Sequence, residues 1–154
     1  MGHLLTVSLT LLTACERFPE DPQRTLANIK ERGSIRVGVI ESSPHLMMDE
    51  SGDVMGAEAR LIQSFADALR VDVEWREGHA EGHFEDLREH RLDLEAGGIT
   101  KQNPWKKHVG FTVPWKVVEG ESDRSYVMAV PKGENAFVMR LERHILQNAD
   151  LRVP

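Results

Sequence analysis

Short β-rich segments alternate with amphipathic helical segments along this chain, and that order constrains its fold more than any other feature. Residues 34–40 and 71–77 alternate apolar with polar side chains, which predicts strands. Between them, Leu61, Ile62 and Phe65 share one stripe at helical spacing, which predicts a helix over residues 57–70. Strands that alternate with helices predict an α/β fold whose parallel or mixed sheet carries helices on both faces.

The rest of the chain continues the pattern. Thr25 is the expected N-cap of a short helix, and Gly33 is its expected stop. Residues 41–56 contain a proline and a Ser-Gly-Asp turn and are expected to form a loop. Further helices are expected over residues 83–91 and 136–147, and further strands over residues 92–99, 108–113 and 125–130.

Length and charge exclude some classes of protein. The 154 residues suffice for one domain with a real core. The net charge of −6, with no long Lys/Arg block to offset it, argues against a nucleic-acid binder. No apolar segment has the length of an ordinary membrane-spanning helix.

The N-terminus has the features of a processing signal. Residues 4–14 form an uncharged run with the length of a secretory signal, and it ends at Cys15, the single cysteine. The sequence Leu-Thr-Ala-Cys resembles a bacterial lipobox, which implies a signal peptide at 1–14, a lipidated Cys15 and a tether at 15–24 before a lobe at 25–150. Glu16 after that cysteine implies a periplasmic protein anchored to the outer membrane. The segment before the run lacks Lys and Arg, and an ordinary N-terminal helix with a core cysteine is the alternative.

Candidate binding residues follow from where ligands bind in α/β sheets, which is at the carboxyl ends of the strands. The loops after the first and third strands, residues 41–47 and 97–105, are therefore the expected site. Gly97 and Gly98 allow the backbone to approach a ligand closely. Exposed N–H groups at such a turn favour a carboxylate.

Several motifs, taken in order, resemble the family 3 extracellular solute-binding proteins, the amino-acid-type binding components of ABC importers. The resemblance covers about residues 26–115, and no single motif decides it. The matching residues are Gly33, Ile35, Arg36, Val37 and Gly38; Gly52, Gly56 and Glu58; Ala66 and Leu69; Leu87 and Asp93; Gly98 and Thr100; and Phe111, Thr112, Pro114 and Trp115.

The resemblance implies one lobe of the type II periplasmic-binding-protein fold, with a mostly parallel sheet of about five strands and helices on both faces. It also implies binding of a small polar or anionic, amino-acid-like solute for uptake or sensing, with an ABC permease or another envelope protein as partner. The predicted ligand-binding residues are Ser42, Ser43, His45, Gly97, Gly98, Ile99, Thr100, Lys101, Trp105 and Lys106.

Two departures from the family pattern bear on function. The family has an arginine shortly after the threonine, whereas here Lys101 follows Thr100, and a lysine lacks the planar bidentate geometry. The family's second lobe is also missing, because residues 126–146 already resemble the returning strand and final helix. The alternative function is therefore an envelope interaction module that has lost solute binding and docks to a partner or forms a homodimer.

Catalysis, metals and cofactors have little support in the sequence. No motif of a nucleophile elbow, phosphate loop or dinucleotide site occurs, so the chain is expected not to be an enzyme and to need no cofactor. His79, His83 and His90 could approach a metal, but a solvated loop is the default expectation. Trp105 is either a wall of the ligand site or a plug over the sheet. Lys101, Lys106 and Lys107 are more often solvated charges than anion ligands.

Overall fold

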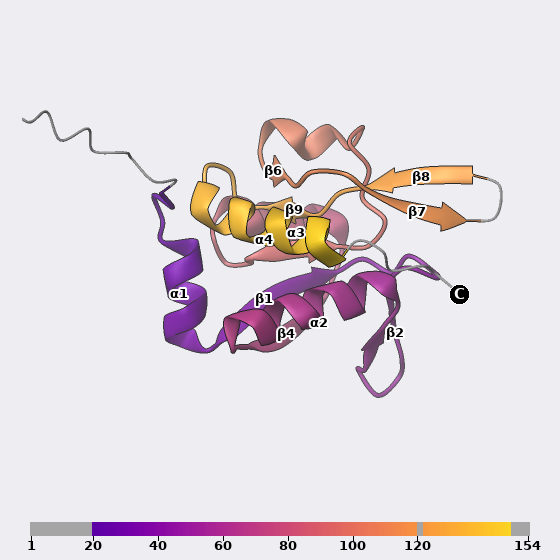
Figure 1. Ribbon diagram of the computed structural model, residues 1–154, viewed down its shortest axis with the longest axis horizontal. Helices are drawn as coiled ribbons and strands as arrows, with labels where there is room; N and C mark the ends of the chain where they lie inside the picture. Colours follow the sequence, from indigo (N-terminus) through magenta and orange to yellow (C-terminus); the bar gives the residue numbers. More distant parts are fainter. Residues whose placement is uncertain (1–19, 120–121, 149–154) are drawn as a thin grey trace, which may run out of the picture.

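Five strands form the central sheet of the computed structural model, in the order β4-β1-β5-β9-β6 (Figure 1). They are β1 (Ser34–Val39), β4 (Asp72–Glu77), β5 (Leu94–Ala96), β6 (Gly110–Phe111) and β9 (Ala129–Val130). β1 pairs in parallel with β4 and β5, whereas β9 pairs antiparallel with β5 and β6. Only β9 therefore runs against the other strands of this sheet, which confirms the predicted α/β fold with a mostly parallel sheet.

The structure describes residues 20–119 and 122–148, and for residues 117–119 and 122–124 it describes the backbone only. The predicted signal peptide at 1–14 and Cys15 lie outside these residues. So do the first half of the predicted tether and the last two residues of the predicted lobe. None of the helices within the described ranges combines the length and apolar character needed to cross a bilayer.

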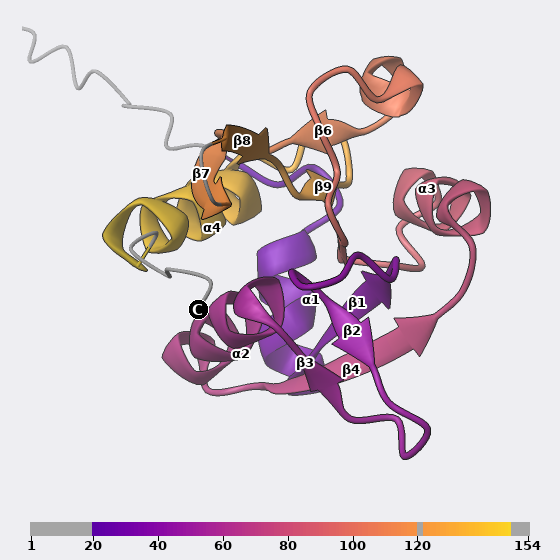
Figure 2. The ribbon, with the colours of Figure 1, turned by 90° about the vertical axis from the view of Figure 1, so that its right-hand side faces the viewer.

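Helices cover both faces of the sheet, as predicted (Figures 1 and 2). On one face lie α1 (Thr25–Arg32), α2 (Ala57–Leu69) and α4 (Asn135–Asn148), and their buried residues share one core cluster with Leu94 and Ala96 of β5. On the other face, α3 (Ala80–Arg88) and the 3-10 helix η1 (Pro104–Lys107) form a second cluster with Ala129 of β9. Because successive residues of a strand point to opposite faces, Glu95 of β5 lies on the α3 side.

The start of α1 differs from the prediction. Thr25 is its first helical residue and not its cap, because side chains from elsewhere bind the free N–H groups. Glu134 accepts a hydrogen bond from Thr25 N at 3.0 Å, and Asp21 accepts one from Leu26 N at 2.9 Å. The other oxygen of Asp21 accepts a hydrogen bond from Phe137 N at 2.9 Å. Two carboxylates thus join the N-termini of α1 and α4.

The returning segment is divided where a single strand over residues 125–130 was predicted. β8 (Ser122–Tyr126) pairs antiparallel with β7 (Trp115–Glu119) in a hairpin that projects from the sheet (Figure 1), and β9 follows after two residues. The break lets the chain leave the hairpin and enter the sheet between β5 and β6. The hairpin therefore occupies the position where the chain of a two-lobed family member crosses into its second lobe, as expected for a single-lobe form.

Local packing accounts for other differences from the predicted elements. The predicted loop at 41–56 contains a small hairpin of β2 (Met47–Met48) and β3 (Val54–Met55). α3 begins at Ala80, three residues before the predicted start at His83. Its buried Phe84 and Leu87 stabilise this turn despite Gly82, because tertiary packing overrides the low helix propensity of glycine.

Candidate ligand-binding cleft

The candidate site lies where β1 and β5 end side by side. Val39 pairs with Ala96, and Ile40 N donates a hydrogen bond to Ala96 O at 3.0 Å, so both strands end at the same edge. The chain then turns sharply at Gly97 and Gly98, whose φ angles are +129° and +68°. Residues with side chains rarely adopt such angles, which explains two successive glycines at this position.

The two glycines also permit a close approach between the loops. A Cβ atom on Gly97 would lie 1.8 Å from the carbonyl oxygen of Ile40, and one on Gly98 would lie 2.3 Å from Ser42 Oγ. Both distances are far below van der Waals contact. The loop after β1 and the loop after β5 are therefore in close contact at both glycines. The predicted role of these glycines, close approach of the backbone to a ligand, stays a prediction.

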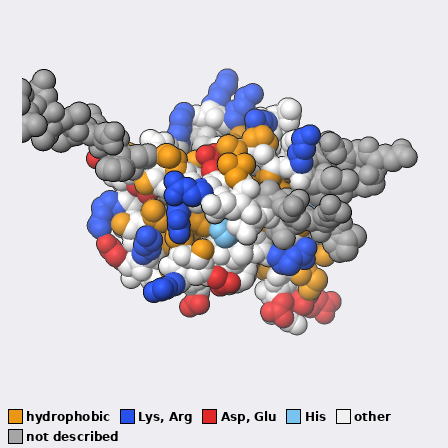
Figure 3. Space-filling model, in the orientation of Figure 1, with side chains coloured by type: hydrophobic (Ala, Val, Ile, Leu, Met, Phe, Trp, Pro, Cys, Tyr) orange, Lys and Arg blue, Asp and Glu red, His pale blue; other side chains and the backbone are white. Residues whose placement is uncertain are grey.

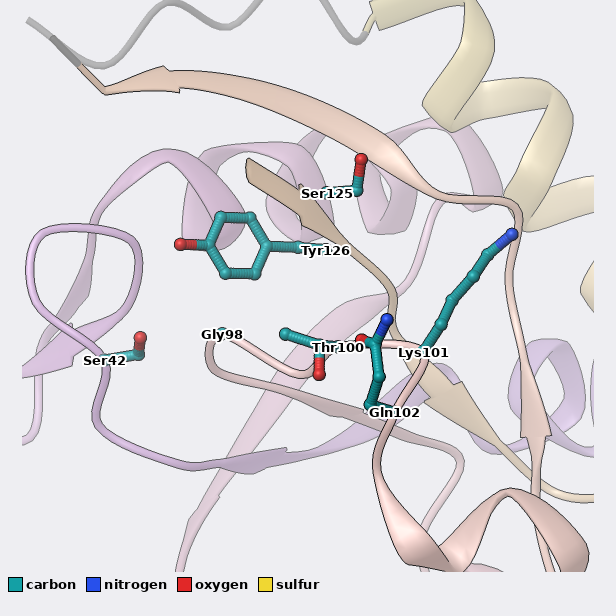
Figure 4. Close-up of a pocket in the computed structure, with 7 residues that line it drawn as sticks. All are labelled: Ser42, Gly98, Thr100, Lys101, Gln102, Ser125 and Tyr126. Atoms are coloured by element: carbon teal, nitrogen blue, oxygen red, sulfur yellow. The ribbon is translucent and has the colours of Figure 1, made fainter. Parts of the chain in front are cut away.

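A cleft of about 470 Å³ opens between these loops and the returning strand β8 (Figure 4). Its volume is in the range of sites for small molecules. Hydroxyl, amide and ammonium groups line it, and among its lining residues only Lys101 has a formal charge. These residues are Ser42, Gly98, Thr100, Lys101, Gln102, Ser125 and Tyr126.

The returning segment holds the cleft together from the side of β8. Tyr126 packs its ring against His45, with 4.6 Å between ring centroids, and against Trp115 at 6.2 Å. Val127 N donates a hydrogen bond to Ile99 O at 2.8 Å. Because His45 and Ile99 belong to the two ligand loops, these contacts connect both loops to the return from the hairpin.

A buried carboxyl group lies beneath the cleft. Glu58, near the start of α2, is fully buried, and its Oε2 accepts a hydrogen bond from Gly98 N at 3.4 Å. Burial raises the pKa of Glu58 to about 7, and hydrogen bonds from the backbone of Gly98 and Gly97 oppose that rise. The sequence indicated only an acid near a helix N-terminus, and the structure places it under the glycine turn.

The structure brings some predicted site residues together and separates others. Ser42, Gly98, Thr100 and Lys101 line the cleft. The remaining predicted residues do not line it: Ser43 is exposed, His45, Gly97 and Ile99 are buried behind its walls, and Trp105 and Lys106 belong to η1. Ligand binding by any of them stays a prediction.

Trp105 lies away from the cleft. Its indole stacks on Phe84 of α3 with 5.4 Å between ring centroids and an interplanar angle of 10°. The other aromatic neighbour of its ring is His108 at 5.7 Å. Trp105 therefore covers the second core cluster, which agrees with the interpretation of this residue as a plug over the sheet.

Three residues that line the cleft were not predicted: Gln102, Ser125 and Tyr126. Gln102 directly follows Lys101 in the same turn. Its position next to a predicted ligand residue could therefore have identified it as a lining residue of the cleft. Ser125 and Tyr126 reach the cleft only because the β7–β8 hairpin brings the chain back over the glycine turn. The sequence indicated the return but not its register.

The histidines predicted as a weak metal candidate lie around α3. His79 precedes the helix, and His83 is buried against Glu95, with 3.8 Å between Nδ1 and Oε1. Within the described ranges, no group of three or more His, Cys, Asp or Glu residues has the arrangement of a metal site. Burial raises the pKa of Glu95 to about 8 and lowers the pKa of His83, so the uncharged form of each is favoured.

A mostly parallel sheet with a polar cleft at its strand ends and a glycine turn beside it is the arrangement expected for one lobe of a solute-binding protein. The sequence comparison agrees, because the model of the bacterial extracellular solute-binding proteins, family 3, matches residues 35–149. The chain belongs to this family.

Solved structures share this fold. The arginine-bound form of domain 1 from TmArgBP is 24% identical, with a TM-score of 0.67, over 78% of this chain and 97% of that one. The cysteine-binding protein from Campylobacter jejuni is 14% identical, with a TM-score of 0.68, over 80% of this chain and 86% of that one. At these identities the likeness shows the fold.

Curated relatives correct one prediction. Proteins named membrane-bound lytic murein transglycosylase F match this chain at 30% identity over 96 residues in Actinobacillus succinogenes and at 29% over 115 residues in Enterobacter sp.. These matches cover 58% and 70% of this chain but only 20% and 22% of the relatives, so the chain spans about a fifth of their length. The prediction that the chain has no enzymatic role is contradicted, since its relatives are named as enzymes. Catalytic motifs gave no sign of this relationship, because the likeness lies in the solute-binding region. The same names, together with the extracellular family, indicate the cell envelope as the location.

Proposed function

We propose that the cleft binds a small amino-acid-like solute through its carboxylate. The observation that carries this proposal is that Ser42, Thr100 and Lys101 line one cleft at the ends of β1 and β5. Hydroxyl groups and an ammonium group in the lining of one cleft suit a carboxylate, and the ring of Tyr126 offers an apolar wall for a side chain. The arginine-bound and cysteine-binding neighbours support amino acids as the solute class.

The lytic transglycosylase relatives favour a role beside murein cleavage over a role in uptake by an ABC permease. In this proposal the lobe senses a solute in the envelope and passes its occupancy to a protein that acts on murein. Anchoring through a lipidated Cys15 is part of the same proposal. It predicts that Cys15→Ala releases the full chain from the membrane fraction; a wild-type protein that is already soluble would rule out the anchor.

A thermal-shift screen with the twenty amino acids tests solute binding. A ligand at ten times its Kd stabilises the folded state by about 1.4 kcal/mol, which is a shift of several degrees for a domain of this size. We expect a reproducible shift that Thr100→Ala and Lys101→Ala abolish. Lys30→Ala, on the exposed face of α1, is the control and should keep the shift. A flat screen at millimolar ligand would overturn the proposal.

The relatives' name supports a second candidate function, which is participation in murein cleavage itself. Incubation of the purified chain with isolated murein tests it, with soluble muropeptides measured by chromatography. Release above that of heat-denatured protein would support cleavage. No release by the chain at high concentration would leave the solute-binding role as the function of this region.

A further inference from the structure

One stretch of this acidic protein carries only positive charge. Between Glu95 and Glu119 the sequence has four lysines and no Asp or Glu, although the whole chain has a net charge of −6. This stretch includes the turn after β5, η1 and β6. Lys and Arg side chains gather at the upper edge of Figure 3, over the part of the chain where Figure 1 shows β6.

Three lysines of this stretch, together with Lys132 from a later turn, form what we call the lysine cluster: Lys101, Lys106, Lys107 and Lys132. Successive turns hold the first three, because Asn103 N donates a hydrogen bond to Thr100 O and Lys106 N donates one to Asn103 O. Lys132 joins them from the turn before α4, where its Nζ donates a hydrogen bond to Lys107 O at 3.0 Å. All four side chains belong to exposed residues.

The charges of the cluster are not neutralised locally. Within residues 20–119 and 122–148, none of these four ammonium groups has a carboxylate within ion-pair distance. Some other surface cations are paired, as Arg24 is with Glu31 and Arg91 is with Asp86. Gathered like charges repel one another, so an anionic partner that covers them gains both the attraction and the relief of that repulsion.

The cluster is continuous with the cleft, because Lys101 and Gln102 line the cleft and begin the turn that leads into η1. We propose that the lysine cluster is a docking surface for an acidic peptide whose terminal residue occupies the cleft. This inference rests on the proposed solute site. A flat anionic membrane pressed on the cluster would close the cleft that Lys101 borders, whereas a peptide can leave the cleft and continue over η1.

Fluorescence anisotropy with labelled tetraglutamate tests the proposal. Labelled tetralysine, a peptide of the opposite charge, is the control ligand. We expect tetraglutamate to bind at least tenfold more tightly than free glutamate, and to weaken as salt rises from 50 to 200 mM because screening shortens the reach of the charges. The double variant Lys107→Glu/Lys132→Glu should lose at least tenfold in affinity for tetraglutamate and keep its affinity for free glutamate, because neither lysine lines the cleft. The matched control Lys30→Glu/Arg60→Glu reverses two exposed charges outside the cluster and should change neither affinity more than twofold.

The outcomes separate the two proposals. If free amino acids bind and tetraglutamate binds no more tightly, or if charge reversal in the cluster has no effect, the docking surface is overturned and the solute site stands. If tetraglutamate binds through the lysines but Thr100→Ala has no effect and amino acids fail to bind, the solute site is overturned, and so is the placement of the peptide's terminal residue in the cleft. Binding to vesicles with 30% phosphatidylglycerol in place of tetraglutamate would assign the cluster to a membrane and overturn the proposal.

Discussion

Glu58 lies directly beneath Gly98, with 3.4 Å between the carboxylate oxygen and the backbone nitrogen at the floor of the candidate cleft. The backbone of Glu58 is tied to the other ligand loop, since its N–H donates a hydrogen bond to His45 O at 3.0 Å. A single buried residue thus contacts both loops. Because its pKa is raised to about 7, its charge changes within the physiological range.

The first prediction concerns Glu58 and pH. The unfolded chain releases this proton near pH 4.5 and the folded chain near pH 7, so the folded state binds more protons between these values and loses stability as pH rises through them. Glu58→Gln cannot ionise and should be more stable than the wild type at pH 8, by about 3 kcal/mol, with little difference at pH 4. Urea unfolding at both pH values measures this. Glu81→Gln, an exposed acid on α3, is the control, and an equal effect in that variant would contradict the prediction.

The second prediction concerns Glu95 on the opposite face of the sheet. Neither carboxylate oxygen has a hydrogen-bond partner among the described residues, and burial alone raises its pKa to about 8. Its ionisation should therefore destabilise the fold progressively from about pH 4.5 to about pH 8. Glu95→Gln should unfold at a higher temperature than the wild type at pH 9 and at nearly the same temperature at pH 4.5. A variant that is destabilised equally at both values would show that the carboxyl group has a structural role that an amide cannot replace.

The sequence predicted the floor of the cleft better than its far wall. The order of strands and helices predicted the sheet, and the ends of its strands predicted the two loops of the site. The close contact between these loops, which leaves no room for a Cβ atom at Gly97 or Gly98, was not predicted. Tyr126 was not predictable as a wall residue. Its position depends on the register of the β7–β8 hairpin, where Trp115 pairs with Tyr126, and local sequence preferences do not determine that register.

Trp105 and Glu58 show a second limit of sequence reasoning. Both lie in or next to motifs that resemble ligand-binding segments, yet the indole stacks on Phe84 over the second core cluster. Glu58 matched a family position as a helix N-terminal acid, and its burial followed only from the packing of Gly98 above it. A loop residue can cover either side of a sheet, and tertiary contacts with distant helices determine which side it covers. The spacing of residues along the chain does not predict these contacts.

The third prediction compares two glycines. Gly97→Ala would place a Cβ atom 1.8 Å from Ile40 O and would hold an alanine at a φ of +129°, so it should destabilise the fold by about 3 kcal/mol or more. Gly82→Ala, in the exposed first turn of α3, has no atom within 4 Å of the new Cβ and should stabilise the fold by about 0.5–1 kcal/mol. Thermal unfolding of both variants measures the contrast. A tolerated Gly97→Ala would mean that the two ligand loops are not in close contact.

The last prediction concerns Asp93, which matches a family position at the start of a strand. Its buried carboxylate accepts hydrogen bonds from the backbone and the guanidinium of Arg36, with 2.7 Å between Arg36 Nη2 and Asp93 Oδ1, and also pairs with Arg32. Asp93→Ala would leave the mostly buried Arg36 without its anion and should destabilise the fold by about 3 kcal/mol. Glu31→Ala breaks the exposed pair with Arg24 and should cost less than about 1 kcal/mol. Equal losses in the two variants, measured by urea unfolding, would show that burial does not set the strength of these ion pairs.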